Sequence, residues 1–178
     1  MTVKWNGNEV TFRRATGVCM DEVLSVLDEV AGWLNARGVS QWPPHFEAAW
    51  VEGAVLRGDT WLVGIGEKAA GTMTLDWSDP LWADVAGTAG YVHRMAMCRW
   101  AAGLGVVVLD WAGDTARRRG VDALRLDCVQ ANGRLRAYYE AYGFVHRGDV
   151  PVGGAPGQRE DDGPLTWVSR YELDLARK

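Results

Sequence analysis

The chain has 178 residues, a normal size for one compact domain, so we expect a single domain over residues 1–178 rather than a disulfide-stapled miniprotein. Apolar residues make up 48% and charged residues 24%, which excludes disordered and fibrous proteins. The net charge of −4 offers no basic excess for binding polyanions, so neither a nucleic acid nor a membrane is expected as a partner.

The first half of the chain alternates between strand and helix patterns. Val10 to Arg14 reads as a strand, and two short apolar runs around a polar turn predict a β-hairpin of Thr60 to Ile65 with Ala70 to Asp76. Apolar residues at helical spacing predict a helix from Asp21 to Arg37, and a second helix from His45 to Arg57 follows a proline pair.

The second half predicts a strand, a helix and a parallel strand at the centre of a mixed sheet, which makes the fold class α/β. The predicted elements are a strand at Gly90–Met97, a helix at Gly103–Arg119, a strand at Val121–Val129, a helix at Asn132–Tyr142 and strands at Phe144–Arg147 and Leu165–Leu173. Residues 151–164, rich in Gly, Pro and acidic residues, are expected to form a flexible loop.

Cysteine usage and the N-terminus indicate a cellular location. Cys19, Cys98 and Cys128 form no CxxC pair and are odd in number, as is typical of free thiols in a reducing compartment. The N-terminal segment has no apolar core of a signal peptide, and no apolar run reaches the about 20 residues that cross a bilayer. We therefore expect an unprocessed cytoplasmic protein.

A glycine-rich turn, Trp100-Ala-Ala-Gly103-Leu-Gly105, lies between a predicted strand and a predicted helix. Glycines allow a ligand to approach the backbone, and the free N–H groups of a first helical turn favour an anion such as a phosphate. The turn is not a dinucleotide fingerprint, because Val108 stands at the third glycine position. A tight turn without a ligand is the alternative interpretation.

Three segments in this order resemble the GCN5-related N-acetyltransferase (GNAT) superfamily over residues 10–175. They are His93-Arg-Met-Ala-Met97, Gly103-Leu-Gly105 and Asn132-x-x-Leu-x-x-Tyr138-Tyr139-Glu-x-x-Gly143-Phe144. The resemblance implies a mostly antiparallel sheet of about six or seven strands with about four flanking helices, and acetyl-CoA as cosubstrate.

The resemblance also implies where the coenzyme binds. The backbone of one strand would pair with the pantetheine arm, and backbone amides of the turn would hold the pyrophosphate. The coenzyme-binding residues expected on this basis are Met95, Ala96, Met97, Arg99, Ala102, Gly103, Leu104, Gly105, Asn132 and Tyr138. The family has Gln or Arg where this chain has Trp100, so Arg99, one residue earlier, is a substitute for that phosphate contact.

The resemblance makes Tyr139 the general acid that protonates the departing thiolate. A phenol with a pKa near ~10 can protonate a thiolate whose thiol has a pKa near ~8.5 once the site is desolvated. The alternatives are a core aromatic for Tyr139 and a helix N-cap for Asn132, which the resemblance otherwise places against pantetheine.

His93 is the candidate base that accepts the amine's proton, with a water chain as the other route. Strict alternation along the strand would put it on the same face as Met95 and Met97. A satisfied core histidine is the alternative. Asp76, and with it Asp79 and Asp84, could bind the amine's charge or relay its proton, although loop acids are more often only solvated.

Tryptophan accounts for ten of the eighteen aromatic residues, an unusual share. Six of the ten lie between residues 33 and 82, in the half expected to bind the acceptor. Trp42, Trp77 and Trp82 lie in or beside loops and are predicted to form an aromatic wall for the acceptor. Core packing is the alternative.

The function expected from these observations is direct transfer of an acetyl group from acetyl-CoA to a primary amine of a small molecule. Two alternatives are a non-catalytic acyl-CoA sensor, and an enzyme of the same fold that uses a longer-chain acyl-CoA or decarboxylates one. No metal is expected, because no HxH, HExxH or paired-cysteine pattern occurs. The acceptor and the oligomeric state stay open, a homodimer included.

Overall fold

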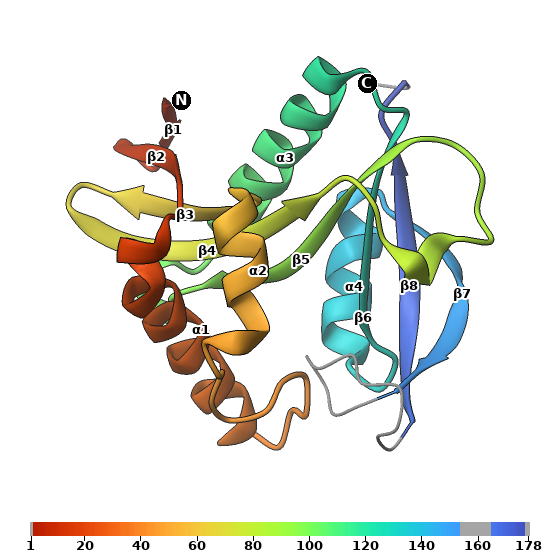
Figure 1. Ribbon diagram of the computed structural model, residues 1–178, viewed down its shortest axis with the longest axis horizontal. Coiled ribbons are helices and arrows are strands. Elements are labelled where there is room, and N and C mark those ends of the chain that lie inside the picture. Colours follow the sequence, from red (N-terminus) through yellow and green to blue (C-terminus); the bar gives the residue numbers. More distant parts are fainter. Residues whose placement is uncertain (1, 154–164, 177–178) are drawn as a thin grey trace.

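A computed structural model describes residues 2–153 and 165–176 (Figure 1). In this part of the chain, eight strands form one sheet in the order β1-β2-β3-β4-β5-β6-β8-β7. The strands are β1 (Thr2–Trp5), β2 (Asn8–Arg14), β3 (Thr60–Ile65), β4 (Lys68–Asp76), β5 (Ala89–Met97), β6 (Ala123–Val129), β7 (Val145–Val152) and β8 (Thr166–Asp174). The helices are α1 (Met20–Asn35), α2 (Ala49–Arg57), α3 (Gly105–Arg119) and α4 (Gly133–Tyr142).

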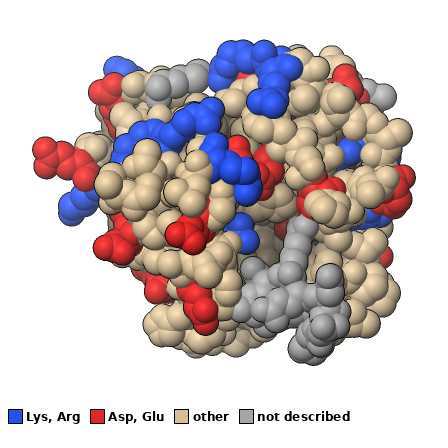
Figure 2. All heavy atoms as spheres, viewed as in Figure 1, with Lys and Arg blue, Asp and Glu red and all other residues tan. Residues whose placement is uncertain are grey.

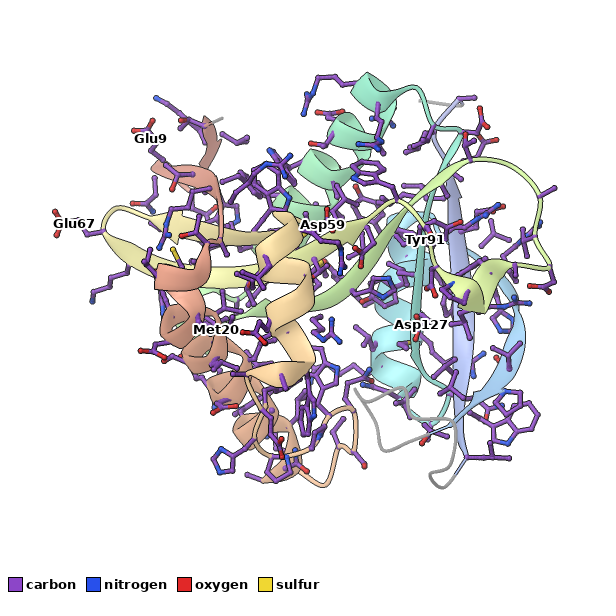
Figure 3. All side chains as sticks on the ribbon, in the orientation of Figure 1. Glu9, Met20, Asp59, Glu67, Tyr91 and Asp127 are labelled. Atoms are coloured by element: carbon purple, nitrogen blue, oxygen red, sulfur yellow. The ribbon has the colours of Figure 1, made fainter. Side chains whose placement is uncertain are left out.

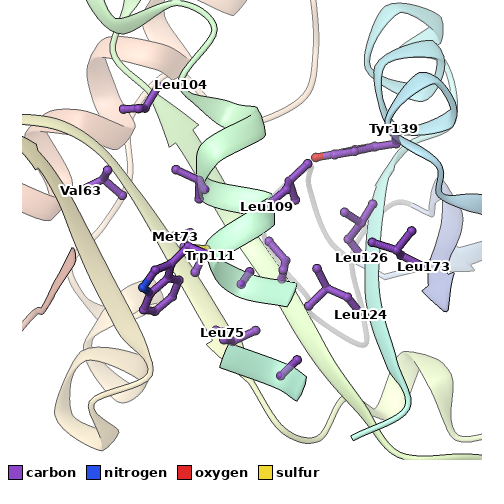
Figure 4. Packing of buried hydrophobic residues seen from close by; sticks show 14 of the residues in the cluster. Val63, Met73, Leu75, Leu104, Leu109, Trp111, Leu124, Leu126, Tyr139 and Leu173 are labelled. Atoms are coloured by element: carbon purple, nitrogen blue, oxygen red, sulfur yellow. The ribbon is translucent and has the colours of Figure 1, made fainter. Parts of the chain in front are cut away.

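The helices cover the two faces of the sheet in pairs, with α1 and α2 on one face and α3 and α4 on the other (Figure 1). The larger core lies under α3 and α4 and includes Leu109 of α3 with Leu124 and Leu126 of β6 (Figure 4). A second core lies under α1, whose buried residues Val23, Val26, Leu27 and Ala31 recur at helical spacing. The mixed α/β fold predicted from the sequence is therefore confirmed.

The sheet has one more strand than the largest number expected. Thr2–Trp5 forms β1, joined to β2 through Asn6 and Gly7, which both have positive φ values (47° and 79°). Asn-Gly is a strong signal for such a two-residue hairpin turn, but the sequence interpretation began the first strand only at Val10.

Two other boundaries differ from prediction by more than two residues. Strand β7 runs to Val152, so residues 151 and 152 of the predicted loop belong to a strand, and residues 154–164 lie outside the described residues. Helix α2 begins at Ala49 instead of His45. The segment before it is tied to α1 instead, because the backbone N–H of Phe46 donates to Asp28. Over the described residues, no helix is both long and apolar enough to cross a membrane.

The centre of the sheet opens between β5 and β6. These strands run parallel and are paired from Ala89 to Val92 on β5 and from Ala123 to Leu126 on β6. Beyond that point β5 follows its other neighbour, β4, and β6 follows β8 as far as Val129. The two strands therefore diverge and leave a gap in the middle of the sheet.

A β-bulge lies in β5 beside this gap. Thr74 of β4 is opposite His93, whereas Thr72, two residues earlier, is opposite Ala96, three residues later. The extra residue bends a strand and turns its side chains. Arg94, inside the bulge, has a φ of 48°, a conformation that is uncommon for a residue other than glycine.

The bulge changes which residues of β5 share a face. Ala96 packs into the core under α1 and α2, and His93 lies on that same face. Met95 and Met97 pack against the core under α3 and α4. The expectation that His93 shares a face with these two methionines is wrong, because the extra residue shifts the alternation by one position.

Candidate active site

The gap between β5 and β6 widens into a cleft of about 480 Å³, a size typical of small-molecule sites. Its walls come from α1, the segment after α1, the second half of β5, the end of β6 and the start of α4. Figure 2 shows the face on which the molecule is hollowed near its centre, with acidic and basic side chains close to the hollow. Because the sheet itself is parted here, residues from both of its faces reach one cavity.

The glycine-rich turn forms one end of the cleft, where Gly103 and Gly105 line it. Gly103 has a φ of 95°, and Gly105 begins α3. The N–H groups of Ala102 and Leu104 already donate to backbone carbonyls within the turn, and the Leu104 side chain is fully buried in the core. Of the four amides predicted to meet the pyrophosphate, those of the two glycines are therefore the better placed.

Replacing Gly103 by alanine is expected to raise the KM for acetyl-CoA several-fold. An alanine would be strained at a φ of 95°, at a cost of about 1–2 kcal/mol, and the turn would relax into another shape. Gly120→Ala is the matched control, because Gly120 also has a positive φ (78°) but caps the far end of α3. An equal KM change in both variants, measured by steady-state kinetics alongside thermal unfolding, would contradict a role for the turn.

Tyr138 of α4 lies directly over the start of α3. A Cβ built on Gly105 would come within 2.7 Å of the Tyr138 hydroxyl and 3.8 Å of Met95 Cε. A glycine here leaves the backbone of the first helical turn accessible from the cleft, as a phosphate requires. The residues of this end thus fit a phosphate-bearing coenzyme. Burial raises the pKa of Tyr138, so its hydroxyl keeps its proton near neutral pH.

Tyr139 reaches from α4 toward α3 beneath the cleft (Figure 4). Its side chain is 5% exposed, and its ring contacts those of Phe144 and Tyr171. Burial raises the pKa of this phenol far above its ordinary value. Tyr139 is therefore a core aromatic, as the alternative interpretation expected. It also lines the cleft, and its hydroxyl stays protonated at physiological pH.

Asn132 caps α4, as the alternative interpretation expected. Its Oδ1 accepts from the backbone N–H of Leu135 at 3.1 Å, and its Nδ2 donates to Gln41 Oε1 at 3.0 Å. Both ends of the amide therefore have protein partners. Gln41, a buried residue after α1 that the sequence interpretation missed, ties the acceptor-side segment to the coenzyme-side helix.

His93 lies among carboxylates on the α1 and α2 face. Its Nε2 is 3.6 Å from Asp79 Oδ2 and 3.8 Å from Asp76 Oδ2. The Asp79 carboxylate is almost fully buried, and its other oxygen accepts from the backbone N–H of Leu81. Burial, reinforced by the nearby Asp59 carboxylate, raises the pKa of Asp76. Acidic groups behind His93 would stabilise an imidazolium if the ring took up a proton.

Asp127 on β6 completes this group from across the gap (Figure 3). Ligand atoms of Asp79, His93 and Asp127 all lie within 4.8 Å of one another, so the three could approach one cation together. No sequence pattern indicates this trio, because its members come from three separate segments. The expectation of no metal stays an expectation.

The structure separates the three tryptophans predicted to form an aromatic wall. Trp42 lines the cleft and meets Phe46 edge to face. Trp82 is 2% exposed and packed in the core, and Trp77 lies elsewhere, under the Arg119 guanidinium at 4.2 Å. The predicted aromatic wall is therefore reduced to Trp42. A position in a loop does not show that a tryptophan is exposed, because so large an apolar side chain is often buried in the core.

Trp33 of α1 is the second tryptophan that lines the described part of the cleft. The guanidinium groups of Arg37 and Arg99 lie over its ring, with their carbon atoms 4.8 Å and 5.0 Å from the ring centroid. Arg99 therefore extends toward α1, and its backbone N–H donates to Glu29. Asp76 is near His93 but outside the cleft lining, and Asp84 pairs with Arg170 away from it.

The sequence is similar to a family model and to a curated protein that are both described as acetyltransferases. A family model described as the acetyltransferase (GNAT) family matches residues 27–144. A curated relative, an uncharacterised N-acetyltransferase YesJ from Bacillus subtilis (strain 168), is 28% identical over 139 residues, which cover 72% of this chain and 77% of that protein.

Solved structures share the fold at low identity. A GNAT-family acetyltransferase from Listeria monocytogenes 4b F2365 superposes with a TM-score of 0.76 at 22% identity, over 98% of this chain and 99% of the other. The structure of yncA, a putative acetyltransferase from Salmonella typhimurium with its cofactor acetyl-CoA, gives a TM-score of 0.61 at 16% identity, over 95% of each chain.

Proposed function

This chain belongs to the GNAT acetyltransferase family, and on that premise we propose that it transfers the acetyl group of acetyl-CoA directly to a primary amine of a small molecule. The observation that carries the proposal is the parted sheet. His93 from one face and Tyr139 from the other line one cleft, so a base and an acid can act on the two ends of the same reaction.

The coenzyme side of the cleft comprises the second half of β5, the turn before α3 and the start of α4. Gly103 and Gly105 would take the pyrophosphate at the N-terminus of α3, where backbone N–H groups and the helix dipole favour negative charge. The arm that leads from the phosphates to the thioester would lie along Met95–Met97, whose edge has left β6. Acetyl-CoA, when bound there, supplies the activated acyl group.

His93 would make the amine nucleophilic. An ammonium cannot attack a thioester, so the acceptor must lose a proton, to the imidazole or to water that leads to it. The carboxylates of Asp79 and Asp76, 3.6 and 3.8 Å from Nε2, would stabilise the positive charge that the ring gains. His93 also lies on the face of the sheet from which Trp42 and α1 border the cleft, which suits an acceptor entering there.

Tyr139 would act at the other end by donating its phenolic proton to the sulfur that leaves. Burial raises the pKa of the phenol, so Tyr139 keeps its proton until the thiolate forms. The same dry environment also raises the pKa of the leaving thiol, so the phenol and the thiol stay comparable as acids. No covalent acyl-enzyme is needed, because the amine attacks the thioester directly.

The test is release of free thiol from acetyl-CoA in the presence of a panel of amines, amino acids, aminoglycosides and peptides. We expect release with at least one acceptor and protection from thermal unfolding by acetyl-CoA alone. Protection without thiol release from any amine would favour the sensor alternative. Product mass spectrometry with malonyl-CoA and longer acyl-CoAs distinguishes the other acyl donors. Absence of both protection and release would contradict the proposal.

A further inference from the structure

Arg94 occupies an unusual position in the cleft. It sits inside the β5 bulge with a φ of 48°, and strained residues of this kind gather at functional sites because the surrounding structure must hold them in place. The side chain is half-buried, lines the cleft, and has its Nε enclosed by protein. The bulge therefore places a half-buried arginine in the lining of the cleft, next to His93.

Arg94 differs from the other arginines that line the described part of the cleft. Arg37 and Arg134 are exposed to solvent at its edge, whereas Arg94 is partly desolvated. An ionic hydrogen bond is stronger where water is partly excluded, so an anion would gain more from Arg94 than from either of the others.

The position of Arg94 along β5 separates it from the phosphate-binding end. Met97 is three residues after Arg94 along the strand, a distance of about 10 Å at ~3.3 Å per residue, and the turn with Gly103 comes only after Met97. The pyrophosphate of a coenzyme at that turn would be out of reach of this guanidinium. Arg94 is instead next to His93 and across the gap from Asp127, where the acceptor amine would be activated.

The end of the cleft around His93 thus carries both signs of charge. Asp127, backed by Asp79, suits an ammonium before it loses its proton, whereas the Arg94 guanidinium would repel a molecule whose only charge is positive. A ligand with both an amine and an anionic group would match this arrangement, because a guanidinium binds a carboxylate through two parallel hydrogen bonds.

We infer that Arg94 binds an anionic group of the acceptor, and that the acceptor is a small zwitterion, an amine that also carries a carboxylate. This rests on the proposed acetyl transfer and names its substrate class. Arg94 already takes part in interactions within the chain, so the carboxylate would join or exchange with them.

The experiment compares kcat/KM for a series of α-amino acids with that for the corresponding α-amino amides, in the wild-type chain, Arg94→Met, Arg94→Lys and Arg118→Met. Methionine is unbranched, so it meets the same backbone strain as arginine. Arg118 lies in the last turn of α3 and controls for loss of one positive charge. Comparing the acid-to-amide ratio between variants cancels the different reactivity of each amine.

We expect the wild-type chain to prefer acids over amides at least tenfold, and Arg94→Met to lower this ratio by about 10- to 100-fold, the usual worth of a hydrogen bond to a charged group. Arg94→Lys should keep part of the preference, because lysine keeps the positive charge but lacks the planar pair of N–H donors that binds a carboxylate through two hydrogen bonds. Arg118→Met should keep all of it.

Equal rates with acids and amides in the wild-type chain, or a preference that survives in Arg94→Met, would overturn the inference while leaving acetyl transfer intact. If no acid, amide or simple amine accepts an acetyl group although acetyl-CoA protects the fold, the proposed function fails and this inference fails with it.

Discussion

Tyr139→Phe is expected to lower kcat for acetyl transfer by about 100-fold or more, with little change in the KM for acetyl-CoA. The substitution keeps the ring, and with it the contacts to Phe144 and Tyr171, but removes the hydroxyl that would protonate the leaving sulfur. The fold should therefore survive. Steady-state kinetics with the best acceptor from the amine panel provide the measurement.

The control for this variant is Tyr142→Phe, on the same helix. The Tyr142 hydroxyl donates to Asp110 at 2.6 Å on the outside of the molecule, so its loss should leave kcat unchanged. Tyr138→Phe tests the neighbouring phenol. If Tyr139→Phe keeps the wild-type rate and Tyr138→Phe loses it, the acid is Tyr138, whose hydroxyl lies over Gly105.

Tyr139→Phe should also change how the free energy of unfolding depends on pH. Because burial raises the pKa of Tyr139 in the folded state, the unfolded chain releases this proton first as the pH rises above about 10. Stability is therefore lost on the alkaline side, and Tyr139→Phe should lose less stability there than the wild-type chain.

Trp82→Ala is expected to reduce the free energy of unfolding by about 3–5 kcal/mol, the usual cost of emptying a buried tryptophan site. The Trp82 ring lies against the guanidinium groups of Arg125 at 5.2 Å and Arg170 at 5.1 Å, and its removal would leave a cavity beside two buried cations. Denaturant titration gives the value. Trp82→Phe should lower the free energy of unfolding by a smaller amount. This variant allows the measurement if the alanine variant does not fold.

Trp42→Ala should raise the KM for the acceptor and lower the free energy of unfolding less than Trp82→Ala does, because Trp42 lines the cleft. For stability, Trp100→Ala is the matched control: its side chain is 52% exposed, and its loss should change little. A large fall in stability for Trp100→Ala, or an unchanged one for Trp82→Ala, would contradict this assignment of the tryptophans.

The order of the elements could be predicted from the sequence because the strong signals are local. Apolar spacing identified α1 and α3, and Gly120 marks the end of α3 because its φ of 78° suits glycine. The bulge at Arg94 could not be predicted, since nothing in His93-Arg-Met-Ala-Met97 shows that β5 has two residues where β4 has one. One extra residue was enough to reverse the predicted face of His93.

The coenzyme end of the candidate site was more accessible to sequence reasoning than the acceptor end. The turn at Gly103 and the start of α4 are continuous segments with fixed spacing. Asp127, Gln41 and Trp33 come together only through strand pairing and through the packing of α1 on the sheet. No local pattern records such contacts, so these residues were missed.

The short pairing of β5 with β6 also has a mechanical consequence. The two parts of the sheet, β1 to β5 on one side and β6, β8 and β7 on the other, are joined in register over four residue pairs before they diverge. The angle at this seam sets the width of the cleft. Gly90 belongs to the seam, and a Cβ there would come within 3.3 Å of both Leu75 and Trp77. A methyl group placed there would require these two side chains to shift by a few tenths of an ångström, so close packing on the β4 side favours glycine at this point of the seam.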